Sequence, residues 1–133
     1  LWGEDRISLL YALHNAEDMV CVPHTVYNYR WGGGTRRFNP QMLAQFSSWH
    51  RVITSSARDL GYDRHIAVAN EELRSVTDYF IRDGILNSHP KEDIVALLVE
   101  HLGITQNEAS KRYSTQEQLI KKNWLKYFIK RII

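Results

Sequence analysis

The feature that most constrains this fold is a series of helix start and stop signals in the chain after Gly34. In "NPQMLAQFSSWHRVITSSARDLG", Asn39 is a good N-cap, Pro40 suits the first helical position, and Gly61 suits the end. This arrangement predicts a helix from about residue 40 to residue 60. Because similar signals recur to the end of the chain, we predict a mainly α structure.

The signals that follow predict further helices. The next helix runs from Arg64 to Arg82 and is closed by Asp83-Gly84. Another is capped by Ser88 or His89 with Pro90, runs to His101 and is ended by Gly103. A short helix in "TQNEASKRYS" follows, and a capping box at Ser114-Thr115-Gln116-Glu117 opens a last helix to the terminus. We find no internal repeat and no low-complexity segment.

The first 38 residues follow a different pattern. Ile7, Leu10, Tyr11 and His14 have helical spacing, which predicts an amphipathic helix from Glu4 to about Glu17. "MVCV" (19–22) and "TVYNYRW" (25–31) predict two short strands, which Gly32-Gly33-Gly34 ends. An isolated two-stranded ribbon is marginal in water. The front part must therefore either pack on the helical unit or belong to a larger α/β domain.

Composition argues against several classes of protein. The net charge of +2 is too small to indicate a nucleic-acid partner. Cys21 is the only cysteine, which excludes a disulfide framework and a cysteine metal cluster. The six histidines form no H-x-H or H-x-x-x-H pair, so we interpret them as surface or core residues. No apolar run approaches the ~18 residues of a membrane span.

The ordered motifs of the front part resemble a known family. Gly3-Glu4-Asp5 opens the predicted helix, "VCVPHTVYNYR" follows, and Thr35 comes five residues after Arg30. This order is similar to the closing part of family 2 glycosyltransferases of the GT-A fold, and it covers about residues 2–38. The resemblance implies that residues 1–38 are the C-terminal edge of a GT-A catalytic domain, with a short two-stranded remnant of its sheet. Residues 39–133 would be an all-α C-terminal domain.

The resemblance also implies roles for individual residues. Asp5 would be the catalytic base of an inverting sugar transfer, with Glu4 beside it as a positioning partner. Arg30 and Thr35 would face the leaving diphosphate, and Gly33 and Gly34, with Gly32, would let the backbone approach it. Thr35 replaces the serine that is commoner in the family and keeps the hydroxyl.

Each of these features also has a simpler interpretation. Glu4 and Asp5 suit the positive end of any helix. Gly32 to Gly34 suit an ordinary linker. Arg30 suits a solvated position at a strand end.

The chain lacks other parts of such an enzyme. It contains no Asp-x-Asp and no strand-turn-helix repeat for a nucleotide sugar. We therefore expect no cofactor in this fragment, a divalent metal (Mg²⁺ or Mn²⁺) only in a longer parent, and no transfer activity by these residues alone. The start without a methionine also leads us to expect a chain cut from a longer one. The implied partners of the parent are a nucleotide-sugar donor and a glycan or lipid-linked acceptor, for polysaccharide or cell-envelope synthesis.

The last predicted helix has two interpretations. One face is apolar and aromatic and comprises Ile120, Trp124, Leu125, Phe128 and Ile132. The basic residues lie away from this face and are Lys121, Lys122, Lys126, Lys130 and Arg131. Such a helix suits a membrane surface with anionic lipid, but the same face could dock on its own bundle. We favour docking, and we expect a cytoplasmic protein, with peripheral attachment to the inner membrane face as the alternative.

A rival hypothesis comes from another functional class. The chain could be a non-catalytic, all-α protein-interaction module whose front ribbon only packs against the helices. A nucleic-acid binder is a weaker third hypothesis, because Arg36-Arg37 and the terminal lysines are basic but no recognition-helix motif is present. The sequence upstream of Leu1 would separate the first two hypotheses.

Overall fold

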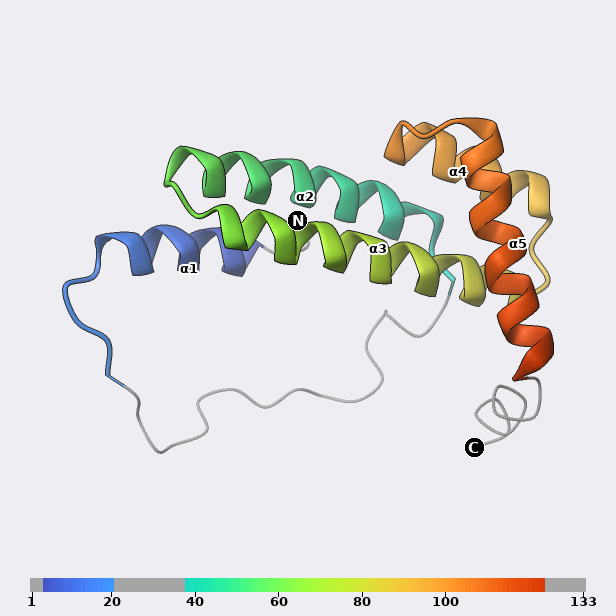
Figure 1. Ribbon diagram of the computed structural model, residues 1–133, viewed down its shortest axis with the longest axis horizontal. Coiled ribbons are helices and arrows are strands. Elements are labelled where there is room, and N and C mark those ends of the chain that lie inside the picture. Colours follow the sequence, from blue (N-terminus) through green and yellow to red (C-terminus); the bar gives the residue numbers. More distant parts are fainter. Residues whose placement is uncertain (1–3, 21–37, 124–133) are drawn as a thin grey trace.

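The computed structural model describes residues 4–20 and 38–123, and within these ranges it contains helices and no strand. The helices are α1 (Glu4–Asn15), α2 (Pro40–Asp59), α3 (Asp63–Leu86), α4 (Lys91–Leu102) and α5 (Gln106–Lys122) (Figure 1). The predicted mainly α character is confirmed. In these ranges no helix is both long enough and apolar enough to cross a lipid bilayer.

Most of the predicted helix ends agree with the structure. The Asn39 side chain accepts a hydrogen bond from the Gln41 N–H at 3.0 Å, and Pro40 begins α2. Gly61 follows α2 with φ +77°, and Gly103 follows α4 with φ +65°. Both glycines adopt the left-handed backbone that commonly ends helices.

The predicted end of the second helix is wrong. Gly84 lies inside α3, which continues to Leu86, and Ser88 takes the left-handed position instead, with φ 61°. The His89 N–H donates to the Gly84 carbonyl and the Ser88 N–H to the Ile85 carbonyl, each at 3.0 Å, which is a Schellman motif. The glycine is required for packing, since a Cβ at Gly84 would lie 2.6 Å from Ile94 Cδ1.

The predicted break between two helices after residue 105 is also wrong, because α5 is continuous. Thr105 is its N-cap and forms a capping box with Glu108. Ser114 and Thr115, which we expected to open a new helix, lie in its interior. Their hydroxyls donate to the Ser110 and Lys111 carbonyls one turn earlier, each at 3.0 Å, as hydroxyl side chains inside helices commonly do.

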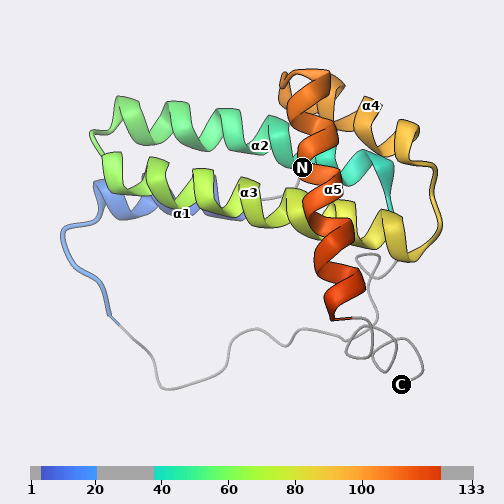
Figure 2. The ribbon, with the colours of Figure 1, turned by 45° about the vertical axis from the view of Figure 1, so that its right-hand side comes forward.

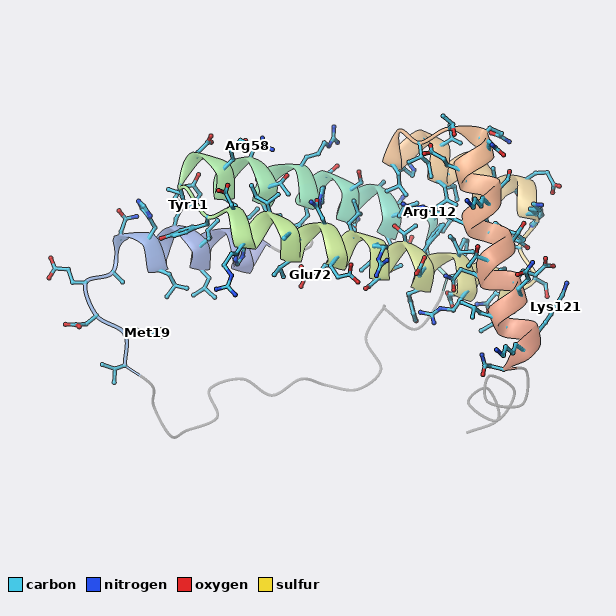
Figure 3. All side chains as sticks on the ribbon, in the orientation of Figure 1. Tyr11, Met19, Arg58, Glu72, Arg112 and Lys121 are labelled. Carbon is cyan, nitrogen blue, oxygen red and sulfur yellow. The ribbon has the colours of Figure 1, made fainter. Side chains whose placement is uncertain are left out.

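The predicted strand at residues 19–22 is wrong for its two described residues. Met19 and Val20 have no regular structure, and they are 74% and 84% exposed. Met19 lies away from the helices (Figure 3). The second predicted strand, 25–31, and the last predicted helix beyond residue 123 lie outside the described residues. Ile120, the described member of that helix's apolar face, is buried at 8% exposure.

The helices form one bundle around an antiparallel pair, α2 and α3, with α1 beside α2 and with α4 and α5 crossing the opposite end (Figures 1 and 2). Two groups of buried residues fill this bundle. The α4–α5 core comprises Leu43, Phe80, Ile81, Ile94, Val95, Leu98, Ala109 and Tyr113. The α1 core comprises Leu10, Phe46, Trp49, Ile53, Ala57 and Ala69.

Candidate functional site

The two predicted catalytic acids lie at the very start of α1. Glu4 is the first residue of the helix and Asp5 the second, so both are in the turn where the helix dipole favours negative charge. The same placement suits the simpler interpretation, in which both residues are ordinary helix-start acids. The structure therefore does not distinguish a catalytic role from this simpler one.

Two polar contacts fix how α1 lies on the bundle. The Tyr11 hydroxyl donates to Ser56 Oγ at 3.3 Å, and His14 Nδ1 lies 3.1 Å from the Tyr62 hydroxyl. Figure 3 shows Tyr11 between α1 and the neighbouring helices. From Tyr11 to His14 along α1, the contacted residue changes from Ser56 in α2 to Tyr62 just beyond its end. α1 and α2 therefore run in the same direction (Figure 1). Asp5 precedes Tyr11 by six residues, or about 9 Å of helix, which places its backbone beside the middle of α2.

The predicted diphosphate-binding residues Arg30, Gly33, Gly34 and Thr35 lie outside the described residues.

Three histidine side chains have contacts that suit packing. His14 pairs with Tyr62, His50 Nε2 lies 2.7 Å from Asn70 Oδ1, and the His89 ring stacks on Phe38. At His101 it is the backbone carbonyl that accepts a hydrogen bond from Ser47. In the described part of the chain no three His, Cys, Asp or Glu side chains gather where they could hold a metal ion.

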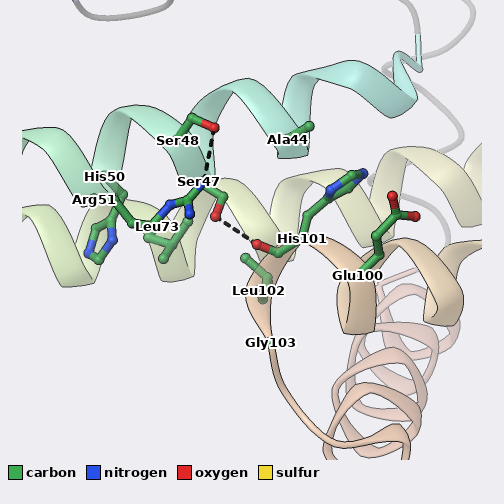
Figure 4. A pocket seen from close by; sticks show the side chains of 10 residues that line it. All are labelled: Ala44, Ser47, Ser48, His50, Arg51, Leu73, Glu100, His101, Leu102 and Gly103. Carbon is green, nitrogen blue, oxygen red and sulfur yellow. Dashed lines mark hydrogen bonds between the residues drawn. The ribbon is translucent and has the colours of Figure 1, made fainter.

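The described residues form a hollow that we did not predict from the sequence. A groove of ≈460 Å³ lies between α2 and the end of α4 (Figure 4), lined by Ala44, Ser47, Ser48, His50, Arg51, Leu73, Glu100, His101, Leu102 and Gly103. Ser47 Oγ donates to the His101 carbonyl at 2.7 Å, and Arg51 Nη2 donates to Ser48 Oγ at 3.3 Å. Its residues come from helices that are distant in sequence, so no local motif could have indicated it.

The groove is separate from the predicted catalytic acids. Ser47 in the groove and Ser56 beside α1 are nine residues apart, which places them on opposite sides of α2. The Ser47 hydroxyl is already engaged by a backbone carbonyl, and the Ser48 hydroxyl accepts from Arg51. The groove can accommodate a small polar molecule, but the hydrogen bonds of its described residues pair no nucleophile with a base.

Comparisons of the chain with protein-family models, with curated proteins and with solved structures found no match. The functional argument therefore depends on the motifs of residues 2–38 and on how α1 lies on the bundle.

Proposed function

We propose that this chain is the C-terminal part of a nucleotide-sugar-dependent, inverting glycosyltransferase that acts in polysaccharide or cell-envelope glycan synthesis. The observation that carries the proposal is the ordered set Gly3-Glu4-Asp5, "VCVPHTVYNYR" and Thr35. A helix that begins at Glu4 agrees with the family pattern, which has its acidic pair at a helix start, and agrees equally with ordinary helix-start acids.

The proposed reaction is a single displacement. The Asp5 carboxylate accepts the proton of an acceptor hydroxyl as that oxygen bonds to the anomeric carbon of the donor sugar. The bond from this carbon to the diphosphate oxygen breaks, and the nucleoside diphosphate leaves with the electron pair. Arg30, Thr35 and the backbone of Gly33 and Gly34 stabilise the charge that grows on the diphosphate.

This chain offers no ligand set for the divalent metal that the resemblance implies. It contains no Asp-x-Asp, and its described residues hold no cluster of metal-binding side chains. The metal and the nucleotide would accordingly be bound by the upstream part of the enzyme.

The surface of α1 supports a neighbour beyond the bundle. Ile7, Leu10 and Tyr11 face the other helices, whereas Leu9 and Leu13 on the flank are 55% and 47% exposed. Leu9 and Leu13 therefore add apolar surface to a side of α1 that its packing on the other helices leaves open. A catalytic domain packed on that flank would cover Leu9 and Leu13.

The same flank also supports the second candidate function, a non-catalytic interaction module that binds another protein through Leu9 and Leu13. The proposals differ in what precedes Leu1. A transferase requires a βα-repeat region with an Asp-x-Asp upstream in the same gene, whereas a start codon close to Leu1 would favour the module.

A binding measurement tests the proposal on the chain itself. Isothermal titration of residues 1–133 with uridine- and guanosine-diphosphate sugars, with and without Mn²⁺, should give no binding, because the donor site is upstream. The full-length protein should bind one of these donors and hydrolyse or transfer it. Tight, metal-dependent donor binding by residues 1–133 would contradict the division of the site, and an inactive full-length protein that lacks donor binding would contradict the transferase proposal.

A further inference from the structure

The groove between α2 and the end of α4 is lined by two opposite charges that do not neutralise each other. Arg51 comes from α2 and Glu100 from α4, and Figure 4 shows them toward its two ends. Among residues 4–20 and 38–123, no ion pair joins them and the Glu100 carboxylate has no hydrogen-bond partner. The hydrogen bond from Arg51 Nη2 to Ser48 Oγ is 3.3 Å long, which is weak geometry for a charged donor.

The part of the groove between the two charges is held by a buried contact and is largely apolar. Ser47 is 9% exposed, and its hydroxyl donates to the His101 carbonyl at 2.7 Å, which fixes the end of α4 against α2. Arg51 follows Ser47 by about one helical turn, or about 6 Å along α2. Leu73 and Leu102 line the groove between the charges in the view of Figure 4. The groove therefore has a positive end, an apolar middle and a negative end.

This order of charges selects a ligand with the complementary order. A carboxylate can accept two parallel hydrogen bonds from the Arg51 guanidinium, and an ammonium group can donate to the Glu100 carboxylate. A simple anion would gain the contact with Arg51 but would be repelled by Glu100, and a simple cation would be repelled by Arg51. Only a molecule that carries both groups satisfies both ends of the groove.

We propose that this groove is a binding site for a small linear zwitterion of the amino-acid class, with its carboxylate at Arg51, its methylene chain over Leu73 and Leu102, and its ammonium group at Glu100. The volume of ≈460 Å³ is in the range of small-molecule sites. The site lies apart from Glu4 and Asp5 and does not depend on the proposed transferase function.

The ligand class can be tested by NMR titration of residues 1–133 with ω-amino acids of increasing length, from glycine through γ-aminobutyrate to ε-aminohexanoate. The amide signal of Gly103, which lines the groove, should shift saturably with a Kd of about 1–10 mM at low salt, because exposed charge pairs are weak and screened. One chain length should bind best, since α2 and α4 fix the separation of the two charges. The amide of Gly61, beyond the end of α2, is the internal control and should not shift. A Gly103 signal that shows no saturable shift with any of these compounds would overturn the proposal.

Neutralising the two charges one at a time tests the orientation of the ligand. Arg51→Gln and Glu100→Gln should each weaken binding of the best zwitterion by about threefold to fivefold. Probes with a single charge should respond with the opposite sign: Glu100→Gln should bind butyrate more tightly than the wild type does, and Arg51→Gln should bind butylamine more tightly.

The matched control for these variants is Arg58→Gln, because Arg58 is an exposed arginine in the last turn of the same helix and does not line the groove. It should leave the affinity for the zwitterion unchanged. Wild-type protein that binds butyrate as tightly as the best zwitterion would overturn the proposal, and so would an equal loss of affinity in Arg58→Gln. None of these outcomes depends on donor binding by the full-length protein, so the site and the proposed function can fail separately.

Discussion

The two ends of the α2–α3 pair are closed in different ways. Four helices contribute to the α4–α5 core, and six of its eight residues, including Phe80 and Leu98, are fully buried at 0% exposure. Three helices contribute to the α1 core, where only Ala57 reaches 0% and Leu10, from the 12-residue α1, is 6% exposed. Both cores are buried, and they differ in the helices that close them: the 12-residue α1 at one end, and α4 with α5 at the other.

This difference indicates which end faces the rest of the proposed enzyme. The α4–α5 core draws its buried residues from α2, α3, α4 and α5, all within residues 38–123. α1 contributes a single buried leucine, Leu10, to its core, while Leu9 and Leu13 are exposed on its flank. The acidic pair at the start of α1 belongs to the same helix as this exposed flank, with its backbone beside the middle of α2.

The comparison can be tested most strongly by the same leucine-to-alanine substitution in each core. Leu98→Ala should lower the free energy of unfolding by about 3–5 kcal/mol, because the site is closed by four helices that cannot collapse around the cavity. Leu10→Ala should cost less, about 1–3 kcal/mol, because the short α1 can shift on α2. Urea denaturation of the two variants gives both values. Equal losses would show that the two cores are equally closed.

The close packing around Gly84 can be tested by adding a methyl group at this position. Gly84→Ala should destabilise the protein by about 1–3 kcal/mol, although alanine is the better helix former, because the new Cβ meets Ile94 Cδ1 at 2.6 Å. Ile94→Val removes that atom, so the double variant should lose less than the sum of the two single variants. Additive losses in thermal or urea unfolding would mean that the two side chains do not compete for this space.

The capping box of α5 makes part of the α4–α5 end sensitive to pH. Hydrogen bonds from the Thr105 backbone N–H and the Thr105 hydroxyl to Glu108, each at 2.9 Å, lower the pKa of the Glu108 carboxyl. A carboxyl with a lowered folded-state pKa stabilises the fold above its unfolded pKa, about 4.3, and this contribution is lost as the pH falls through the folded pKa.

Thr105→Ala should therefore cost about 1 kcal/mol at pH 7. Glu108→Gln should lower the Tm at pH 7, and its difference from wild type should shrink as the pH approaches 3. Thermal unfolding at both pH values measures these effects. A Glu108→Gln deficit that is the same at pH 3 would contradict the assignment of the pKa shift to this box.

The smallest effects are expected at two equivalent turn positions, one at each end of the bundle. Gly61 after α2 and Ser88 after α3 both have positive φ, 77° and 61°, but only Ser88 carries a Cβ. Ser88→Gly should stabilise the protein by about 0.5 kcal/mol, and Gly61→Ser should destabilise it by about 1 kcal/mol. No atom lies within 4 Å of a Cβ at Gly61, so its cost comes from the backbone alone. Changes of the same sign in urea unfolding would contradict this account of the two turns.

Sequence signals predicted the helix ends correctly where the residues that decide them are near in sequence. The Asn39 cap, Pro40 and the left-handed Gly61 and Gly103 act within a few residues, and each is where the sequence indicated.

Two predictions of helix ends failed for different reasons. A capping box at Thr105 and Glu108 opens α5 earlier than the predicted start at Ser114, which is a local signal that was missed. Gly84 was interpreted as a helix end, yet it lies inside α3, where distant residues, Ile94 and Phe38, leave no room for a Cβ. The groove beside Ser47 depends likewise on where α4 ends, which no local pattern gives.

The predicted catalytic site also has a part that local sequence explains and a part that depends on distant residues. The start of α1 at Glu4 follows from its acids and its apolar spacing, and the structure places both acids in the first turn. The roles of Asp5, Arg30 and Thr35 depend on partners that act across the chain and on a donor site upstream, so they remain predictions.

The central claim is that Asp5 is the base of a sugar transfer, and steady-state kinetics of Asp5→Asn in the full-length protein tests it most directly. The amide keeps the shape of the side chain but cannot accept the acceptor's proton. Turnover should therefore fall about 10²–10⁴-fold while donor binding, measured by calorimetry, stays nearly unchanged. Glu4→Gln is the matched control and should lose less. An Asp5→Asn enzyme that retains most of its turnover would make Asp5 only a helix-start acid and would contradict the account.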